Sequence, residues 1–252
     1  MISIMKNKLI KYILTAAFWV AVWQLISMAV GLEILIPSPI KTLTTLFSLL
    51  GQGKFYLAVV SSLARIISGF LLGVIFGIIG AVLSVRFAVF EALASPVLRL
   101  ARAVPVASFI ILAFVWIKTD LVPVFISFLM VLPIVWDNAE SGILNADKKL
   151  IEMGKVYGLN EKEITARIRI PLIVPSFISA CMTALGLAWK AGVAAEVICK
   201  PINSLGGNLA DAKVYLETPT VFAVTAVVVI LSLLLETLIK KTVRRFTYDK
   251  YE

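Results

Sequence analysis

Residues 58–84 read AVVSSLARIISGFLLGVIFGIIGAVLS, an apolar stretch in which Arg65 is the only charged residue. A helix of about 20 predominantly apolar residues is long enough to cross the hydrocarbon core of a bilayer. Similar stretches lie on both sides of this one, separated by polar or charged segments. They predict an all-α, polytopic membrane protein with six transmembrane helices, at residues 12–31, 58–84, 96–117, 121–143, 171–198 and 219–239.

The composition agrees with a membrane protein and argues against an enzyme. Of the 252 residues, 60% are hydrophobic and 15% are charged, whereas soluble domains contain about 45–50% apolar residues. The absence of histidine excludes imidazole metal centres and nucleophiles activated by histidine. Cys181 and Cys199 lie in or beside apolar stretches, which argues against a disulfide framework or a zinc site. We therefore expect no catalytic residues and no bound metal.

The net charge of +9 is distributed asymmetrically along the chain. If the N-terminus is cytoplasmic, most lysines and arginines fall on cytoplasmic segments, as the positive-inside rule requires. These residues are Lys6, Lys8, Lys11, Arg86, Arg99, Arg102, Lys148, Lys149, Lys155, Lys162, Arg167, Arg169, Lys240, Lys241, Arg244, Arg245 and Lys250. This asymmetry explains the basic charge without a nucleic-acid partner, and it predicts that both termini are cytoplasmic.

The longest polar segment between the predicted spans, about residues 138–170, has the pattern of two short helices joined by a hinge. Leu150, Met153 and Tyr157 recur at helical spacing and give the first helix one apolar stripe on a charged surface. Gly158 follows where the end of a helix favours a left-handed residue. A short helix with one apolar stripe needs another surface against which to bury it.

The sequence also indicates where the second helix of this segment and the following span begin. Asn160, with Glu163 three residues later, has the pattern of a capping box, in which each side chain hydrogen-bonds to the backbone of the other residue. Pro171 suits the first turn of the next span, where its missing N–H removes no helical hydrogen bond. We therefore expect a defined, rigid loop.

A spaced motif runs through the same loop. Glu152-Met153-Gly154 is followed after three residues by Gly158, and after nine more by Ile168-Arg169-Ile170-Pro171. This arrangement resembles the signature E-A-A-x3-G-x9-I-x-L-P of ABC-importer permeases, and both spacings fit. Met153 and Gly154 replace the two alanines, and Ile170 replaces the leucine, so these positions stay small or apolar.

Other segments are similar to the nitrate/sulfonate/taurine branch of that family. Ile36-Pro37-Ser38-Pro39 resembles its LPSP segment, and Arg102-Ala103-Val104-Pro105 resembles its R-P-I-P element. Residues 186–189 with Glu196, and residues 205–212, are similar to two further stretches of the branch. The resemblance therefore extends over nearly the whole chain.

The resemblance implies a type I ABC importer-like permease fold. It implies a single transmembrane domain, 1–252, with a core transport domain at about 55–245 and a coupling loop at about 144–170. In this family the loop forms a coupling helix that docks into a groove of a separate ATPase subunit. The residues that the resemblance assigns to coupling are Leu150, Glu152, Met153, Gly154, Tyr157, Gly158, Ile168 and Pro171. The chain has no G-x4-G-K-[ST] loop, so ATP and Mg would be held by the partner and this chain would carry no cofactor.

We therefore expect the permease subunit of an ATP-driven importer in a bacterial inner membrane. The partners implied are two ATPase subunits, a second permease copy in a homodimer, an extracytoplasmic substrate-binding protein and the lipid bilayer. The branch implies a small polar or anionic nutrient, such as a sulfonate, taurine or nitrate, or a vitamin precursor similar to the thiamine pyrimidine. The alternative is a secondary transporter or channel without an ATPase, whose uptake would survive ATP depletion and collapse with the ion gradient.

One face of the predicted fifth span is a candidate wall of the substrate pathway. Ser179, Thr183, Gly186 and Lys190 lie at helical spacing and form a polar face of small residues. A lysine inside the bilayer is costly next to lipid, so Lys190 should face protein or water. It either lines the pathway and attracts a polar or anionic substrate, or it pairs with a carboxylate; the candidates are Glu196, Asp137 and Glu140.

Trp189 and Glu196 lie on a neighbouring face of the same span. They are candidates to stack on a substrate ring and to hydrogen-bond it, although a tryptophan is commoner at the membrane interface. Asp137 and Glu140 lie near the inner end of the fourth span, where we expect them to cap the helix or to pair with Arg99 or Arg102. The alternative is a role in ion transport.

The second span carries a stripe of glycines. Gly69, Gly73 and Gly77 are four residues apart, which predicts close packing against another helix. The functional alternative is that the two helices slide along this surface during alternating access. Arg65 lies one turn before Gly69. Because it is near a helix end, we expect its side chain to extend to the lipid headgroups rather than to bind substrate.

Overall fold

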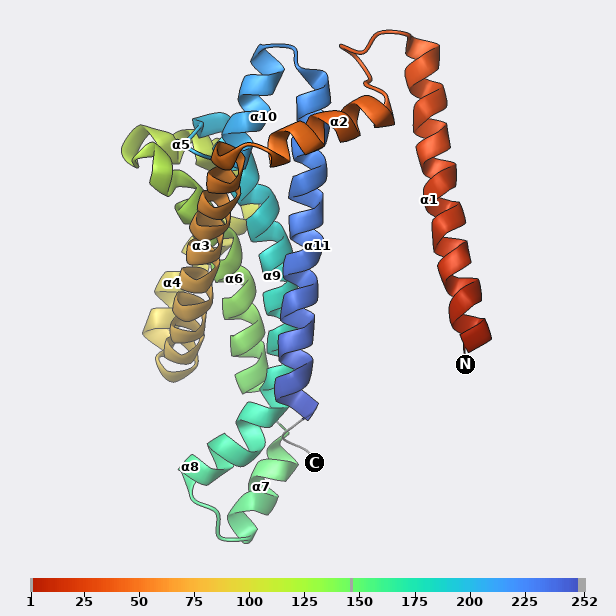
Figure 1. Cartoon of the computed structure of the whole chain (residues 1–252). Coiled ribbons are helices and arrows are strands. Elements are labelled where there is room, and N and C mark those ends of the chain that lie inside the picture. The colour runs from red at the N-terminus through yellow and green to blue at the C-terminus, as the bar shows by residue number, and fades with distance from the viewer. Residues whose placement is uncertain (1, 146, 249–252) are drawn as a thin grey trace.

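The computed structural model describes residues 2–145 and 147–248 (Figure 1). Outside the described residues lie 1, 146 and 249–252. Residue 146 belongs to the predicted coupling loop, and Lys250 is one of the lysines predicted to be cytoplasmic. The helices are α1 (Ile2–Val30), α2 (Pro39–Leu50), α3 (Gly53–Arg86), α4 (Ala88–Ala103), α5 (Val106–Trp116), η1 (Thr119–Leu121), α6 (Val122–Leu144), α7 (Lys148–Val156), α8 (Glu161–Ile164), the π-helical turn η2 (Thr165–Arg169), α9 (Ile170–Cys199), α10 (Leu205–Val214) and α11 (Thr218–Tyr248).

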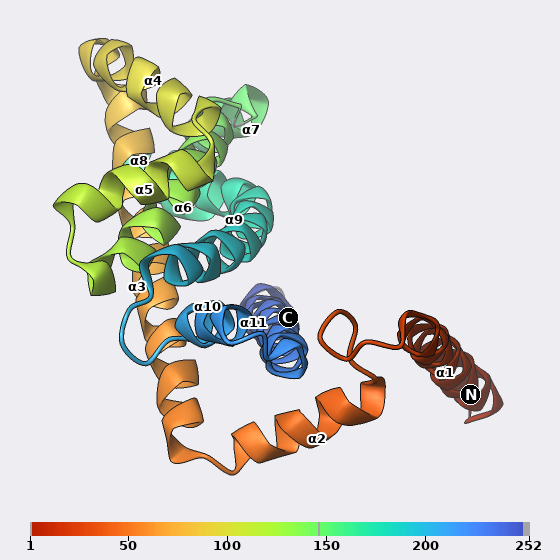
Figure 2. The same cartoon turned by 90° about the horizontal axis from the view of Figure 1, so that it is seen from above.

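The centre of the bundle is formed by α3, α6 and α9, with α11 on one side and the α4–α5 pair on the other (Figure 2). The start of α1 and the end of α11 lie toward the end of the molecule that carries α7 and α8 (Figure 1). Five of the predicted spans coincide with α1, α3, α6, α9 and α11. By length and composition, the described part of the chain has five helices able to cross a membrane, or six if α4 and α5 count together as one span.

The glycine stripe lies where α3 approaches α6 most closely. A Cβ atom added to Gly69 would lie 2.2 Å from the carbonyl oxygen of Val124, and one added to Gly73 or Gly77 would lie 2.6 or 2.9 Å from the Cβ of a valine of α6. Larger side chains at these positions would hold the two backbones apart. Gly69, Gly73 and Gly77 thus lie in the close contact between α3 and α6.

The predicted third span, 96–117, is wrong as a single straight helix. Helices α4 and α5 meet at 109°, with the break at Val104 and Pro105. Val104 has extended backbone (φ −79°, ψ 133°), because the ring of a following proline disfavours helical geometry. Pro105 has no N–H to donate to the preceding turn, so the helix ends before it and α5 begins after it.

Two helices, α2 and α10, lie in segments that the hydropathy pattern predicts only as connections between spans. Helix α2 begins at Ser38, whose Oγ accepts a hydrogen bond from the N–H of Lys41 at 3.2 Å, with Pro39 in its first turn. Helix α1 stands apart from the bundle (Figures 1 and 2) and contacts α11 through Trp23, which stacks on Phe222 at 5.7 Å between ring centroids.

Candidate functional site

The loop between α6 and α9 forms the helices that the sequence predicts. Asp147 caps α7 by accepting a hydrogen bond from the N–H of Lys149 at 2.9 Å. Gly158 has a φ of +76°, which makes it the left-handed residue expected after the helix. Asn160 and Glu163 exchange the two hydrogen bonds of a capping box, both 3.0 Å long. The predicted caps of this loop are therefore confirmed.

One face of α7 packs on α8 and on the turn η2, which leads into α9. Gly154 is buried there, and a Cβ atom at this position would lie 2.8 Å from the Cδ1 of Ile168 and 3.5 Å from the Cγ1 of Ile164. Small size at residue 154 therefore lets the two helices approach each other. Ile168 supports α7 from inside the loop, and it is only partly exposed.

The opposite face of α7 carries an exposed apolar patch, which consists of Met153, Val156 and Tyr157. Their exposed fractions are 50%, 86% and 79%. The predicted stripe was partly wrong, because Leu150 is half-buried while Val156, which the prediction omitted, is the most exposed of the three. The spacing of Val156 three residues after Met153 could have identified it. Glu152 is exposed beside the patch.

The second short helix of the loop, α8, is continuous with the long helix α9. Helix α8 continues through η2 into α9, and Pro171 lies in the first turn of α9. Glu161 accepts ion pairs from Lys155 of α7 at 3.5 Å and from Arg169 of η2 at 3.3 Å. Two kinds of contact therefore connect α7 to the continuous segment α8–η2: apolar packing at Gly154, and the ion pairs of Glu161.

The exposed face of α9 keeps much of the predicted polar character. Ser179, Thr183 and Lys190 are exposed, and Ser176 continues the same face toward α7. Near that end, a cavity of about 360 Å³ is lined mainly by polar residues of α6, the loop and α9. Its lining residues are Asn138, Ser141, Gly142, Asn145, Asp147, Leu172 and Ser176. Polar groups thus extend along one side of the molecule from the loop to Lys190.

Three predicted pathway residues lie elsewhere. Trp189 is 1% exposed, and its Nε1 donates a hydrogen bond to the carbonyl of Val228 in α11 at 3.1 Å. Gly186 is half-buried and faces α11, where Glu236 is its nearest neighbour. Glu196 is fully buried. The prediction that Trp189 and Glu196 contact substrate is wrong for this conformation, because their side chains are covered by the chain itself.

Lys190 forms no ion pair within the described residues. Of the carboxylates proposed as its partners, Asp137 pairs with Arg102, with an Nη2–Oδ1 hydrogen bond of 2.9 Å, as the sequence predicts. Glu196 pairs with Arg65, at 3.5 Å between Nη1 and Oε1. The pairing alternative for Lys190 is therefore not observed, and the residue is exposed.

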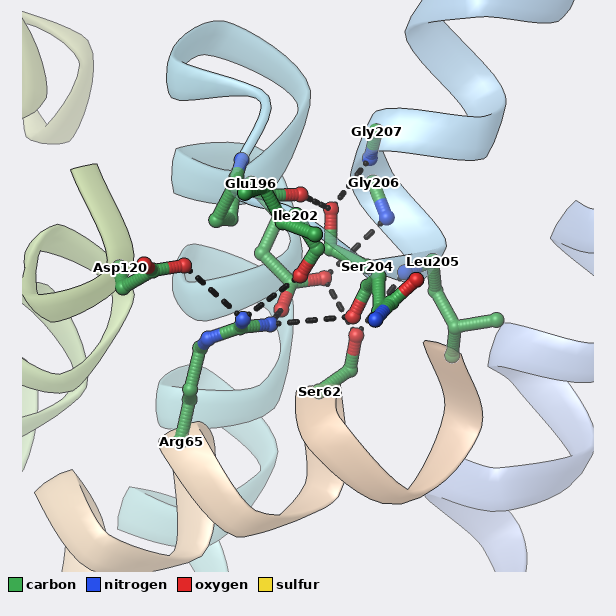
Figure 3. A network of polar contacts seen from close by, with 11 residues as sticks. Ser62, Arg65, Asp120, Glu196, Ile202, Ser204, Leu205, Gly206 and Gly207 are labelled. Carbon is green, nitrogen blue, oxygen red and sulfur yellow. Dashed lines mark hydrogen bonds and ion pairs between the residues drawn. The ribbon is translucent and has the colours of Figure 1, made fainter. Parts of the chain in front are cut away.

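A buried network holds the opposite end of the bundle (Figure 3). The Oε2 atom of Glu196 accepts hydrogen bonds from the hydroxyl of Ser62 at 2.7 Å and from the N–H of Gly206 at 3.1 Å. The Ser62 hydroxyl accepts in turn from the N–H of Leu205 at 2.9 Å. One carboxylate thus connects α3, α9 and the start of α10.

Arg65 completes this network. Its guanidinium donates to Asp120 at 3.0 Å and to the carbonyls of Ile202 and Asn203 at 2.8 and 3.2 Å, besides its ion pair with Glu196. Only 16% of its side chain is exposed. The expectation that Arg65 extends to the headgroups is wrong, because acceptors from three segments, Glu196, Asp120 and the Ile202–Asn203 backbone, hold its guanidinium.

The family described as "Binding-protein-dependent transport system inner membrane component" matches residues 69–248 of this chain. The chain belongs to this family. It is therefore a multi-pass inner-membrane permease of an ABC importer, and such permeases are not enzymes. The family and the helical membrane fold agree with the predictions from the sequence. Among residues 2–145 and 147–248, no group of three or more Cys, Asp or Glu side chains is placed to hold a metal ion.

Several relatives resemble the permease over most of its length. A Brucella melitensis protein named "Probable ABC transporter permease protein" is 30% identical over 236 residues, which cover 93% of this chain and 95% of that protein. An Escherichia coli protein named "Putative aliphatic sulfonates transport permease protein SsuC" is 31% identical over 220 residues, which cover 84% of this chain and 83% of that protein. The taurine transport system permease protein TauC of Escherichia coli is 26% identical, with coverages of 93% and 86%.

A solved structure shares the fold of this permease. The crystal structure of an amino acid ABC transporter with histidines matches with a TM-score of 0.62 at 15% sequence identity. The match covers 78% of this chain and 94% of that chain. At this identity the likeness concerns the arrangement of the helices alone.

Proposed function

We propose that α7 is the coupling helix of this permease and that its exposed patch docks on an ATPase subunit, which holds ATP and Mg. The observation that carries the proposal is the exposed patch of Met153, Val156 and Tyr157 on a helix that packs against α8 and η2. Exposed apolar side chains outside the apolar part of a membrane helix mark a surface for another protein. Gly154 of α7 contacts Ile168 of η2, and η2 continues into α9, so a displacement of α7 is transmitted to α9 through this turn.

We propose further that two copies of the permease face each other across the polar side of α9, with the loop in the cytoplasm. Ser179 and Thr183 lie within an apolar span and are exposed in a single copy. Polar side chains at bilayer depth favour water or protein over lipid. A second copy opposite this face would enclose a polar pathway that ends at the cavity beside Asn138 and Ser141.

The proposed substrate is a small sulfonate, such as taurine, delivered by an extracytoplasmic binding protein. Lys190 is exposed and has no carboxylate partner among the described residues, which supports an anionic group on the substrate. The names of SsuC and TauC refer to the transport of aliphatic sulfonates and of taurine, which carry an anionic sulfonate group. The permease itself changes no covalent bond; it alternates between two conformations that the ATPase biases.

The proposal is tested by transport in proteoliposomes that contain the permease, its ATPase subunit and its binding protein. Taurine and an alkanesulfonate should enter only when ATP and Mg are supplied on the side of α7. Uptake should continue after an ionophore has abolished the ion gradients. Uptake that needs the gradient but no ATP would instead establish the secondary transporter.

Replacing Lys190 with glutamine should lower the initial rate of taurine uptake about five- to tenfold, because the pathway loses the charge that attracts the sulfonate. Uptake should also depend less on ionic strength. The matched control is Lys213→Gln, which removes an exposed lysine of α10. Equal rates for Lys190→Gln and the control would contradict a pathway role for Lys190.

A further inference from the structure

An apolar groove of about 540 Å³ lies between α3, α6 and the base of α9. Val82 of α3 and Ile143 of α6 line it opposite Ile173 and Phe177 of α9. Ile170, at the rim, is 49% exposed, and Val82 is 50% exposed. None of these residues lies on the exposed polar face of α9 that carries Ser179 and Lys190.

The groove has one polar end. Thr165 and Arg169 of η2 lie there, with the Nη1 of Arg169 donating to the Thr165 hydroxyl at 3.3 Å. Glu161 is shared between Arg169 and Lys155, so this group of three charges keeps a net positive charge of one. Free N–H groups remain on the guanidinium, and the threonine hydroxyl still has its own proton to donate.

The position of the groove relative to the bilayer follows from the sequence of α9. From Ile170 onward the helix has no charged residue before Lys190, whereas η2 carries Arg167 and Arg169. The hydrocarbon core therefore begins near Ile170, and the polar end of the groove lies at headgroup level. The occupant of the groove thus needs an apolar chain and, at one end, an anionic group that accepts hydrogen bonds.

We propose that an anionic phospholipid binds in this groove. Its phosphate accepts hydrogen bonds from the guanidinium of Arg169 and the hydroxyl of Thr165, and one acyl chain lies against Val82, Ile143, Ile173 and Phe177. Such a lipid rests on the helical turn that joins the loop to α9, beside the residues that fix α7. Charge at one end and an apolar lining at the other distinguish this site from the general lipid surface of the bundle.

The site is tested by native mass spectrometry of the full-length permease in detergent, titrated with dioleoylphosphatidylglycerol and, separately, dioleoylphosphatidylcholine. The wild type should retain one phosphatidylglycerol per copy of the chain in preference to phosphatidylcholine. Arg169→Gln should lower that preference about fivefold. Arg167→Gln removes the same charge from an exposed position of the same turn outside the groove and should leave the preference unchanged.

A second pair of variants tests the apolar part. Val82→Trp should fill the groove and reduce retention of both lipids, whereas Val85→Trp, at an exposed position outside the groove, should not. Equal loss of preference in Arg169→Gln and Arg167→Gln would mean that surface charge alone attracts the lipid, and it would overturn the proposal. So would unchanged retention by Val82→Trp, or a loss of dimer mass in that variant, which would make the groove an interface between copies.

Discussion

A permease with aspartate in place of Val156 should reach the membrane in normal amount and lose at least about tenfold of its uptake. The 86% exposure of Val156 means that the folded chain tolerates a charge there. Docking on the ATPase subunit would instead bury an unpaired carboxylate, which costs more than the roughly 1.4 kcal/mol that a tenfold loss of affinity represents. Uptake of labelled taurine and co-purification of the ATPase subunit measure the effect.

The control for this experiment is Lys162→Asp, which introduces the same group at an exposed site of α8 outside the patch. It should keep both uptake and the bound ATPase subunit. Met153→Asp should behave like Val156→Asp, whereas a change at Leu150 would be ambiguous because that side chain is half-buried. Full uptake by Val156→Asp and Met153→Asp would show that the ATPase does not bind this face of α7.

Replacing Arg65 with alanine should strongly destabilise the helix bundle. It leaves the fully buried carboxylate of Glu196 without its cation, and breaking a buried pair in this way costs about 3–5 kcal/mol. Thermal unfolding of the purified permease in detergent, followed by circular dichroism, should show a clearly lowered midpoint.

Two further variants separate the buried charge from other effects of losing Arg65. Asp120→Asn removes only the partner of Arg65 that is 59% exposed, and it should cost less than about 1 kcal/mol. The double variant Arg65→Ala, Glu196→Gln buries no charge and keeps an acceptor for Ser62 and Gly206, so it should regain much of the stability. A double variant as unstable as Arg65→Ala alone would place the importance of Arg65 in its bonds to Ile202 and Asn203.

The features that the sequence predicts correctly depend on neighbouring residues. The caps at Asn160 and Gly158 are formed by residues a few positions apart, so their spacing determines them. The glycine stripe of α3 is also predictable from the sequence, because a four-residue spacing places small residues on one face of a helix. The bend at Val104 and Pro105 has a local cause too, but the strong hydropathy of 96–117 outweighed the proline in the prediction.

The features that the sequence does not predict depend on residues far apart along the chain. Ser62 and Glu196 are separated by 134 residues, and Ser62 and Leu205 by 143. Periodicity assigns each of them to a face but does not say which face of another helix it meets. Glu196 therefore appeared as a substrate ligand, when its carboxylate holds the backbone of α10 in place.

Helix α9 runs without a break from Ile170 to Cys199 and has 30 residues. At 1.5 Å per residue its length is about 45 Å. Swinging such a helix through about 5° about one end displaces the other end by about 4 Å. A modest push on the loop is thus enough to shift the anchored carboxylate of Glu196, and with it α10, at the far side of the bilayer.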